Sequence, residues 1–288
     1  MTSATPSPHS PAALSVHGTV VARYHDGSDV EPVLSPRPHL HPVRTLGGTA
    51  VTEVRPEDHR HHLGVSVAVP DVSGVSFWGG RTFTRDRGSV LLDNHGRQQH
   101  LEWLAVEDSR LVELLSWTGP DGTELLREER TWAARPLGDG AWALDVVTRL
   151  RNTGGRDLSI GSPATNGRPR AGYGGFFWRA PVAADPPRVL GPGSDSEEEL
   201  HGSRADWLAL AGRSPEGRDW TLVFCQDGPE RDPWFLRAAE YPGVGAALAW
   251  EERLPVPAGG GLARHVTTVV ADGHPDPAAL ADAARHRP

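Results

Sequence analysis

Short β-type runs separated by glycine and proline follow one another along almost the whole chain. The 288 residues include 33 glycines and 26 prolines, which interrupt the runs at the spacing typical of β-sandwiches and barrels. Within residues 142–150, apolar side chains alternate with polar ones such as Asp145 and Arg149, as in a half-buried strand. The other main expected strands cover residues 18–24, 63–69, 89–92, 111–117, 125–132, 220–224, 246–250 and 262–270.

Helical patterns are scarce in this sequence. The clearest one is at residues 275–285, where Asp276 is placed to cap an alanine-rich segment, and a shorter one surrounds residues 197–200. Runs of strands without alternating helices favour stacked antiparallel sheets over a parallel βαβ fold. We therefore predict an all-β protein with little helix and a short C-terminal helix.

The length and composition favour a single large β domain. A β-sandwich of this size commonly forms one domain, and we place it at residues 15–274. The Ser/Pro/Ala-rich residues 1–14 are expected to be a disordered tail. Residues 275–288 form the short helix and the end of the chain.

The charged residues exclude several classes of function. The formal net charge is −8, and all basic side chains except histidine are arginine, because the sequence contains no lysine. A Schiff-base or phosphate-loop mechanism that needs lysine is therefore excluded. An acidic chain without basic runs argues against nucleic acid and anionic membranes as partners.

The single cysteine and the hydropathy pattern bear on location. Cys225 cannot form an internal disulfide, which fits a reducing compartment. No run approaches the roughly 20 apolar residues that cross a bilayer, and the first residues lack the pattern of a secretory signal. We expect a cytoplasmic protein with no membrane partner.

Histidines are concentrated in one part of the sequence. Half of the 14 histidines fall between His39 and His100, in about a fifth of the chain. Histidine titrates near neutral pH and suits general acid–base chemistry or metal binding. The expected catalytic residues are His39, His41, Asp58, His59, His61, His62 and His95.

The spacing within these groups predicts which rings converge. In an extended segment, residues two apart point to the same side, so His39 can meet His41 and His59 can meet His61. Asp58 is placed to orient a neighbouring imidazole. No carboxylate follows either pair at the spacing of a jelly-roll dioxygenase site. No cofactor is predicted, but a divalent metal held by imidazoles stays an alternative.

Polar and aromatic strings supply expected ligand contacts. Arg44 suits a carboxylate or a developing oxyanion, and aromatic faces can stack on a sugar ring while amides and arginines bond its hydroxyls. Carboxylates considered as partners of the histidines are Asp93, Glu128, Glu240 and Glu251. The expected substrate-binding residues are Arg44, Trp78, Asn94, Glu128, Asn166, Tyr173, Trp178 and Arg179.

Several strings in order resemble one uncharacterised family. They are RPHLHPVRT, DHRHHLG, FWGGRTF, LLDNHGRQ, IGSPATNGRP, GYGGFFWR and RDPWFLRAAEYPGVG. Together they are similar to the group labelled methane oxygenase or PmoA-like, over about residues 20–272. That label does not fit as chemistry, because methane monooxygenase subunits are membrane proteins and this sequence has no spanning segment.

A more distant similarity concerns the fold. HRHHLG after an extended segment, and PVPAGGG before residues 262–270, resemble the galactose-mutarotase-like supersandwich. The resemblance implies an antiparallel β-supersandwich that binds a sugar on a concave sheet and uses histidine and carboxylate acid–base pairs. The mutarotases have a catalytic glutamate near the C-terminus, and either Glu240 or Glu251 could correspond to it in this sequence.

These observations lead to one prediction and two alternatives. We predict a carbohydrate-processing enzyme with a histidine acid–base site, acting on a small-molecule sugar as an epimerase, lyase or hydrolase. The first alternative is a metal-dependent lyase, hydrolase or oxygenase with histidine ligands. The second is a non-catalytic sugar-binding module, and the sequence does not predict an oligomeric state.

Overall fold

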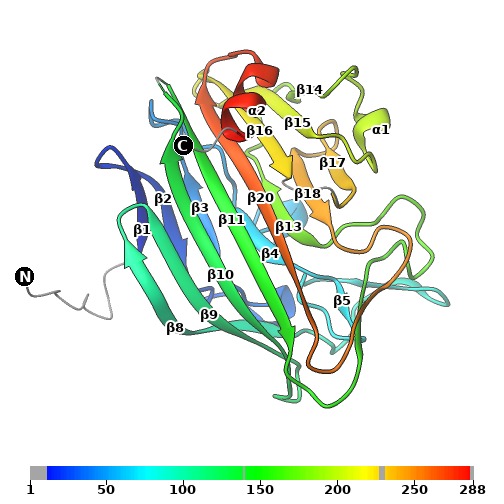
Figure 1. Cartoon of the computed structure of the whole chain (residues 1–288). Helices are drawn as coiled ribbons and strands as arrows, with labels where there is room; N and C mark the ends of the chain where they lie inside the picture. The colour runs from blue at the N-terminus through cyan, green and yellow to red at the C-terminus, as the bar shows by residue number, and fades with distance from the viewer. Residues whose placement is uncertain (1–11, 139, 227–230, 286–288) are drawn as a thin grey trace, which may run out of the picture.

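The computed structural model describes residues 12–138, 140–226 and 231–285. Two large sheets are stacked against each other, and every pairing between the named strands is antiparallel (Figure 1). The predicted all-β class with stacked antiparallel sheets is confirmed.

The first large sheet has seven strands. In spatial order they are β1 (Ala13–Val16), β2 (Thr19–His25), β3 (His39–Val43), β4 (Val65–Ala68), β13 (Gly175–Arg179), β18 (Gly243–Ala247) and β17 (Trp234–Arg237). This sheet therefore combines strands that lie far apart in the sequence.

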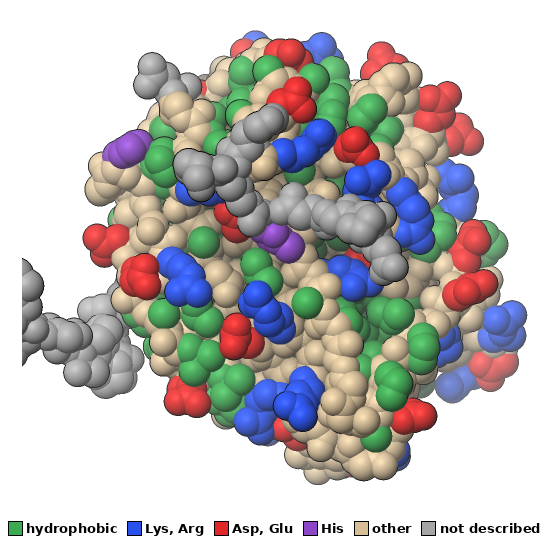
Figure 2. All heavy atoms as spheres, in the orientation of Figure 1, with side chains coloured by type: hydrophobic (Ala, Val, Ile, Leu, Met, Phe, Trp, Pro, Cys, Tyr) green, Lys and Arg blue, Asp and Glu red, His purple; other side chains and the backbone are tan. Residues whose placement is uncertain are grey.

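The second large sheet has eight strands. In spatial order they are β14 (Arg188–Leu190), β15 (Trp207–Arg213), β16 (Asp219–Gln226), β20 (Gly261–Asp272), β11 (Ala141–Asn152), β10 (Glu124–Pro136), β9 (Arg110–Thr118) and β8 (Arg97–Glu107). The outward face seen in Figure 2 mixes acidic, basic and apolar side chains, as expected for a sheet with one face in water.

Smaller elements complete the fold. β19 (Leu254–Val256), β12 (Leu158–Gly161) and β5 (Asp71–Val72) form a three-stranded sheet, and β6 (Thr82–Thr84) pairs with β7 (Gly88–Val90). The short helices are η1 (Pro32–Leu34), η2 (Glu57–His59), α1 (Glu197–Leu200) and α2 (Pro277–Arg285). No helix of the described residues is long and apolar enough to span a membrane.

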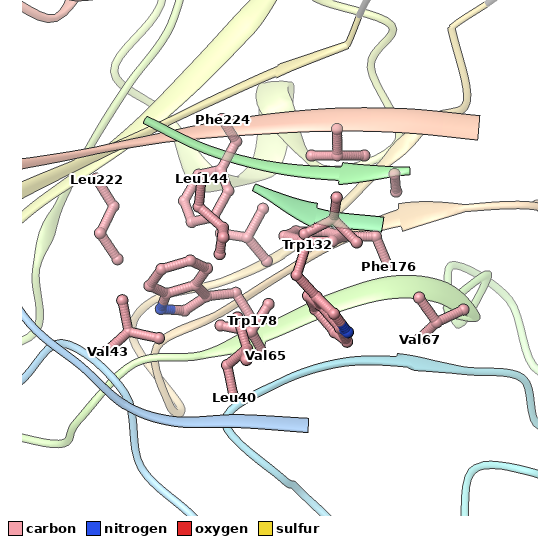
Figure 3. Packing of buried hydrophobic residues seen from close by; sticks show 14 of the residues in the cluster. Leu40, Val43, Val65, Val67, Trp132, Leu144, Phe176, Trp178, Leu222 and Phe224 are labelled. Atoms are coloured by element: carbon pink, nitrogen blue, oxygen red, sulfur yellow. The ribbon is translucent and has the colours of Figure 1, made fainter. Parts of the chain in front are cut away.

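The core lies between the two large sheets. Figure 3 shows Trp178 of β13 and Trp132 of β10 packed among aliphatic side chains from both sheets. Both rings are fully buried, and burying large apolar surface is the main favourable term in folding. The predicted alternation in residues 142–150 is confirmed, because Trp142, Leu144 and the other even-numbered positions are buried.

Several predicted elements are present with shifted bounds. Helices are present at both predicted places, as α1 and α2. The predicted strand at residues 246–250 lies earlier, as β18. Of the predicted tail, residues 1–11 lie outside the described residues, whereas Ala13 and Leu14 already belong to β1 and Leu14 is fully buried.

Candidate functional site

The seven-stranded sheet has a second apolar layer on the face turned away from the main core. Phe177 of β13 and Phe235 of β17 point to this side, because the residues that flank each of them along its strand belong to the core between the sheets. Phe177, Phe235 and Ala68 form a separate cluster with the buried rings of Trp78 and Tyr241. This layer is the floor of the candidate site.

The histidine-rich loop before β4 lies over that floor. Three imidazoles pack together: the ring centroid of His62 lies 4.6 Å from that of His59 and 4.7 Å from that of His61. The prediction of an extended segment at His59–His61 is wrong, because η2 occupies Glu57–His59 and a turn follows. Pro56 at the start and two acidic residues in the first turn favour a helical turn here.

Arg37 connects this loop with the segment that carries Trp78 through hydrogen bonds. Its guanidinium is fully buried and donates hydrogen bonds to the carbonyl oxygens of His61 (2.6 Å) and Trp78 (3.1 Å). Burial lowers the pKa of Arg37 to about 9. Arg37 is not among the residues predicted for the site, because no local sequence pattern indicates that its side chain is buried.

A pocket of about 390 Å³ opens beside the three histidines. It brings together six of the residues predicted from the sequence: Asp58, His59, His61, His62, Trp78 and Tyr173. It is completed by Gly80, Arg81, Ser89, Arg168, Ala171, Phe235, Arg237, Glu240 and Tyr241. We call this space the histidine pocket.

The aromatic side chains of the pocket form one wall. The ring centroids of Trp78 and Tyr173 lie 4.6 Å apart, and Tyr173 meets Phe235 edge-on at 5.3 Å. Burial raises the pKa values of Tyr173 and Tyr241, so both phenols are neutral at ordinary pH. A neutral aromatic wall with hydroxyl groups suits the apolar face of a sugar ring.

Asp58 and His59 form a hydrogen bond at the rim of the pocket. Oδ2 of Asp58 lies 2.7 Å from Nδ1 of His59. Burial by itself would raise the pKa of Asp58, but the hydrogen bond from His59 and the charge of Arg179 hold it below the ordinary value. Asp58 is therefore ionised near neutral pH, and Nδ1–H of His59 donates to it.

His61 and His62 are held in the neutral form. Burial, followed by the charge of Arg37, lowers the pKa of His61 to about 3. Burial and the neighbouring imidazoles lower the pKa of His62 well below 6.5. Nδ1 of His62 is buried and makes no hydrogen bond with any described protein atom. A buried polar atom without a partner is costly unless a ligand or water satisfies it.

Arg179 lies beneath the site and does not line it. Its side chain is fully buried, with Nη2 3.4 Å from Glu53 and 3.8 Å from Asp58. The guanidinium also stacks on Tyr241, 4.7 Å from the ring centroid. The predicted substrate contact of Arg179 stays a prediction, and the geometry favours a supporting position under Asp58 and Tyr241.

The first histidine group lies elsewhere. His39 is buried in β3, stacks on His25 and bonds the carbonyl oxygen of Arg37, and burial lowers its pKa to about 3. His41 contacts the hydroxyl of Thr52 at 3.0 Å. Arg44 donates to the carbonyl oxygen of Gly48, and none of the three predicted residues lines the histidine pocket.

Two predicted residues lie just behind the pocket wall. Nε2 of His95 lies 2.7 Å from the carbonyl oxygen of Gly80, which is a wall residue. Asn94 donates to the carbonyl oxygen of Gly74 and accepts from Thr82. Both side chains organise the loop that carries Trp78 and Arg81.

The remaining three predicted residues have structural partners. Glu128 is fully buried between the sheets and binds Arg130 at 2.6 Å. Asn166 donates to Asp71. Trp178 is buried in the main core, and its indole donates to the carbonyl oxygen of Val51.

Sequence reasoning missed the residues that reach the pocket from distant segments. Arg81 and Arg168 come from loops in which other residues were predicted to bind the ligand, and Arg237 and Tyr241 come from β17 and the turn after it. Glu240, one of the carboxylates considered as a histidine partner, lines the pocket. The RDPWFLRAAEYPGVG string was the one sequence signal for this region.

A metal site needs several donor side chains that converge on one point. Among the described residues, no group of three or more His, Cys, Asp or Glu side chains is arranged to hold a metal ion. The metal-dependent alternative combined imidazoles from two of the three histidine groups. His39 and His41 of the first group do not line the pocket that contains His59, His61 and His62.

The fold and the site define a two-sheet antiparallel β protein with a histidine pocket on the outer face of one sheet. The chain belongs to the Family of unknown function (DUF6807), which matches residues 12–285. The resemblance to the PmoA-like group stays a prediction. No curated protein sequence matches the chain.

Solved structures give the following likenesses. A protein assigned as an aldose 1-epimerase from Escherichia coli K12 is 12% identical, with a TM-score of 0.47, over 91% of this chain and 98% of that one. The heparan sulfate lyase HepC from Pedobacter heparinus is 9% identical, with a TM-score of 0.37, over 88% of this chain and 34% of the lyase.

Proposed function

We propose that this protein is a carbohydrate-processing enzyme and that the histidine pocket is its acid–base site. The observation that carries the proposal is the Asp58–His59 pair at 2.7 Å on the rim of a pocket walled by Trp78 and Tyr173. A carboxylate that orients an imidazole is a recurrent arrangement for proton transfer.

His59 is assigned the proton transfer itself. Because Asp58 accepts from Nδ1–H, Nε2 is the ring nitrogen left to exchange a proton with a ligand. The ionised Asp58 also stabilises the imidazolium that forms when Nε2 gains a proton. Side-chain exposure of 30% keeps His59 accessible from the pocket.

His61 and His62 are assigned to ligand orientation. Both are neutral near pH 7, so each ring can donate one hydrogen bond and accept another. The unpartnered Nδ1 of His62 is matched by a sugar hydroxyl, which both donates and accepts. Glu240, which also lines the pocket, is the second carboxylate available to take or give a proton.

The experiment is a turnover assay that does not presuppose the reaction. A panel of sugars and glycosides is incubated with the wild-type protein, and anomeric and ring protons are followed by NMR. We expect one class of sugar to react and the variant His59→Gln to lose about 10²-fold or more in rate. The matched control is His274→Gln, which alters an exposed histidine outside the pocket.

The outcomes separate the three functions predicted from the sequence. Loss of turnover on treatment with a chelator supports the metal-dependent alternative. Binding of a sugar without any product supports the non-catalytic alternative. Unchanged turnover in a folded His59→Gln variant contradicts the proposed role of the Asp58–His59 pair.

A further inference from the structure

The wall of the histidine pocket carries more cations than its carboxylates balance. Arg81, Arg168 and Arg237 line it together with Asp58 and Glu240. Each carboxylate already faces a cation: Asp58 lies 3.8 Å from the buried Arg179 beneath it, and Glu240 lies 3.7 Å from Arg237. The whole chain has a formal charge of −8, so a local surplus of cations is a feature of the pocket and does not follow from composition.

Arg81 and Arg168 are the two cations left over. Within the part of the chain that the structure describes, neither makes an ion pair with a carboxylate. They come from different loops, Arg81 from the segment after Trp78 and Arg168 from the loop before Tyr173. Because both line the same pocket, their guanidinium groups are available to an anionic ligand bound there.

Both side chains are oriented by neutral partners. Arg81 donates from Nε to the hydroxyl of Ser89 (3.3 Å) and from Nη2 to its carbonyl oxygen (2.6 Å). Arg168 makes a side-chain hydrogen bond with Tyr173. Burial raises the pKa of Tyr173, and the charge and hydrogen bond of Arg168 offset part of this rise. Neutral partners fix the direction of a guanidinium without neutralising its charge, which reduces the entropy lost when an anion binds.

We infer that the sugar bound in the histidine pocket is acidic and that Arg81 and Arg168 bind its anionic group. The inference rests on the proposed sugar-binding function. Carboxylate, sulfate and phosphate share the chemistry that a guanidinium recognises, namely oxygens that accept two parallel N–H bonds.

The first experiment compares neutral sugars with their acidic counterparts by titration calorimetry. Galactose is measured against galacturonate, galactose 6-sulfate and galactose 6-phosphate, and glucose against the same three derivatives. We expect at least one acidic sugar to bind about tenfold or more tightly than its neutral parent. That preference is expected to shrink between 50 and 500 mM NaCl, since salt screens exposed charges. The tightest-binding derivative identifies the anion.

The second experiment assigns the preference to residues. Arg81→Gln and Arg168→Gln are each expected to weaken binding of the acidic sugar about tenfold and to leave the neutral parent unchanged. Matched controls are Arg87→Gln and Arg170→Gln, which remove exposed arginines from the same two loops but outside the pocket wall. All four side chains are exposed, so the variants should fold, and thermal melting checks this.

Each result decides a separate claim. Equal binding of neutral and acidic sugars overturns the inference and leaves the proposed function standing. An acidic preference that survives in both pocket variants overturns the assignment to Arg81 and Arg168. If no sugar of either series binds or reacts, the proposed function and the inference fall together.

Discussion

Nδ1 of His59 lies 2.7 Å from Oδ2 of Asp58, and the next residue pair along the same loop, His61 and His62, is more deeply buried. One imidazole of the loop is thus paired with a carboxylate and open to the pocket, whereas the other two are neutral and packed against aromatic rings. Neighbouring residues of one type acquire different roles because their environments differ.

Replacing Asp58 by asparagine tests the pairing. The amide no longer stabilises the imidazolium and no longer fixes Nδ1–H of His59, so turnover is expected to fall about 10²-fold or more. Folding should be unaffected, because the Asp58 side chain is 54% exposed. The rate is measured with the sugar identified by NMR. Glu57→Gln, an exposed acidic neighbour that does not line the pocket, is the control and should keep wild-type turnover.

Gly80 tests how closely the pocket wall fits His61. Its φ is +72°, and a Cβ at this position would lie 3.0 Å from Nδ1 of His61. Gly80→Ala should therefore lower the free energy of unfolding by about 1–2 kcal/mol from the backbone alone and also displace the histidine.

The matched control for Gly80 is Gly88. It has a φ of +66° and open space around the added Cβ. Gly88→Ala should show the same backbone cost in urea denaturation without any loss of ligand affinity. Equal affinities in the two variants would contradict the close contact between Gly80 and His61.

Glu128 tests whether a predicted ligand contact is structural. Its carboxylate is fully buried and accepts hydrogen bonds from Arg130 and from the indole of Trp117. Glu128→Gln leaves the buried Arg130 charge uncompensated and is expected to cost about 3–5 kcal/mol of unfolding free energy. The neighbouring Glu129→Gln removes an exposed ion pair with Arg149 and should cost less than about 1 kcal/mol. Similar losses for the two variants in urea denaturation would contradict this account.

Buried neutral histidines make the stability depend on pH. The pKa values of His39 and His61 are lowered to about 3 by burial, against 6.5 for an unperturbed histidine. Between these values the unfolded chain binds more protons, so stability is complete above pH 6.5 and is lost as the pH falls toward 3. Each such histidine contributes up to about 1.4 kcal/mol per pH unit.

Urea denaturation at pH 7, 6 and 5 measures this dependence. The free energy of unfolding should decrease at each step, and His39→Gln should show a smaller decrease than the wild type. His274→Gln, at an exposed position, should keep the wild-type slope. Equal stability at pH 7 and pH 5 would show that these imidazoles are not buried in the neutral form.

The sheet architecture was predictable from local patterns. Residues 142–150 alternate with a period of two, and β11 buries Trp142 and Leu144 as that period requires. The end of the chain carries its own capping residue, Asp276, immediately before α2. Both signals are contained in a few neighbouring residues, which is why a single sequence reveals them.

The site was predictable only in part, because it depends on strand pairing across the whole chain. His39 and His59 have the same residue type and similar neighbours, yet the first lies in a strand of the sheet and the second in a loop over its outer face. Tyr241 reaches His62 only because β18 pairs with β13, and β13 with β4. No pattern within one segment specifies those pairings.

The central claim is that the ligand site is built from His59, His61 and His62 and not from His39, His41 and His95. The most direct measurement is a histidine-selective ¹⁵N NMR titration with the sugar that binds or reacts, with resonances assigned through single His→Gln variants. The ring signals of His59, His61 and His62 are expected to shift on saturation while those of His39 and His41 stay in place. Shifts confined to His39 and His41 would contradict it.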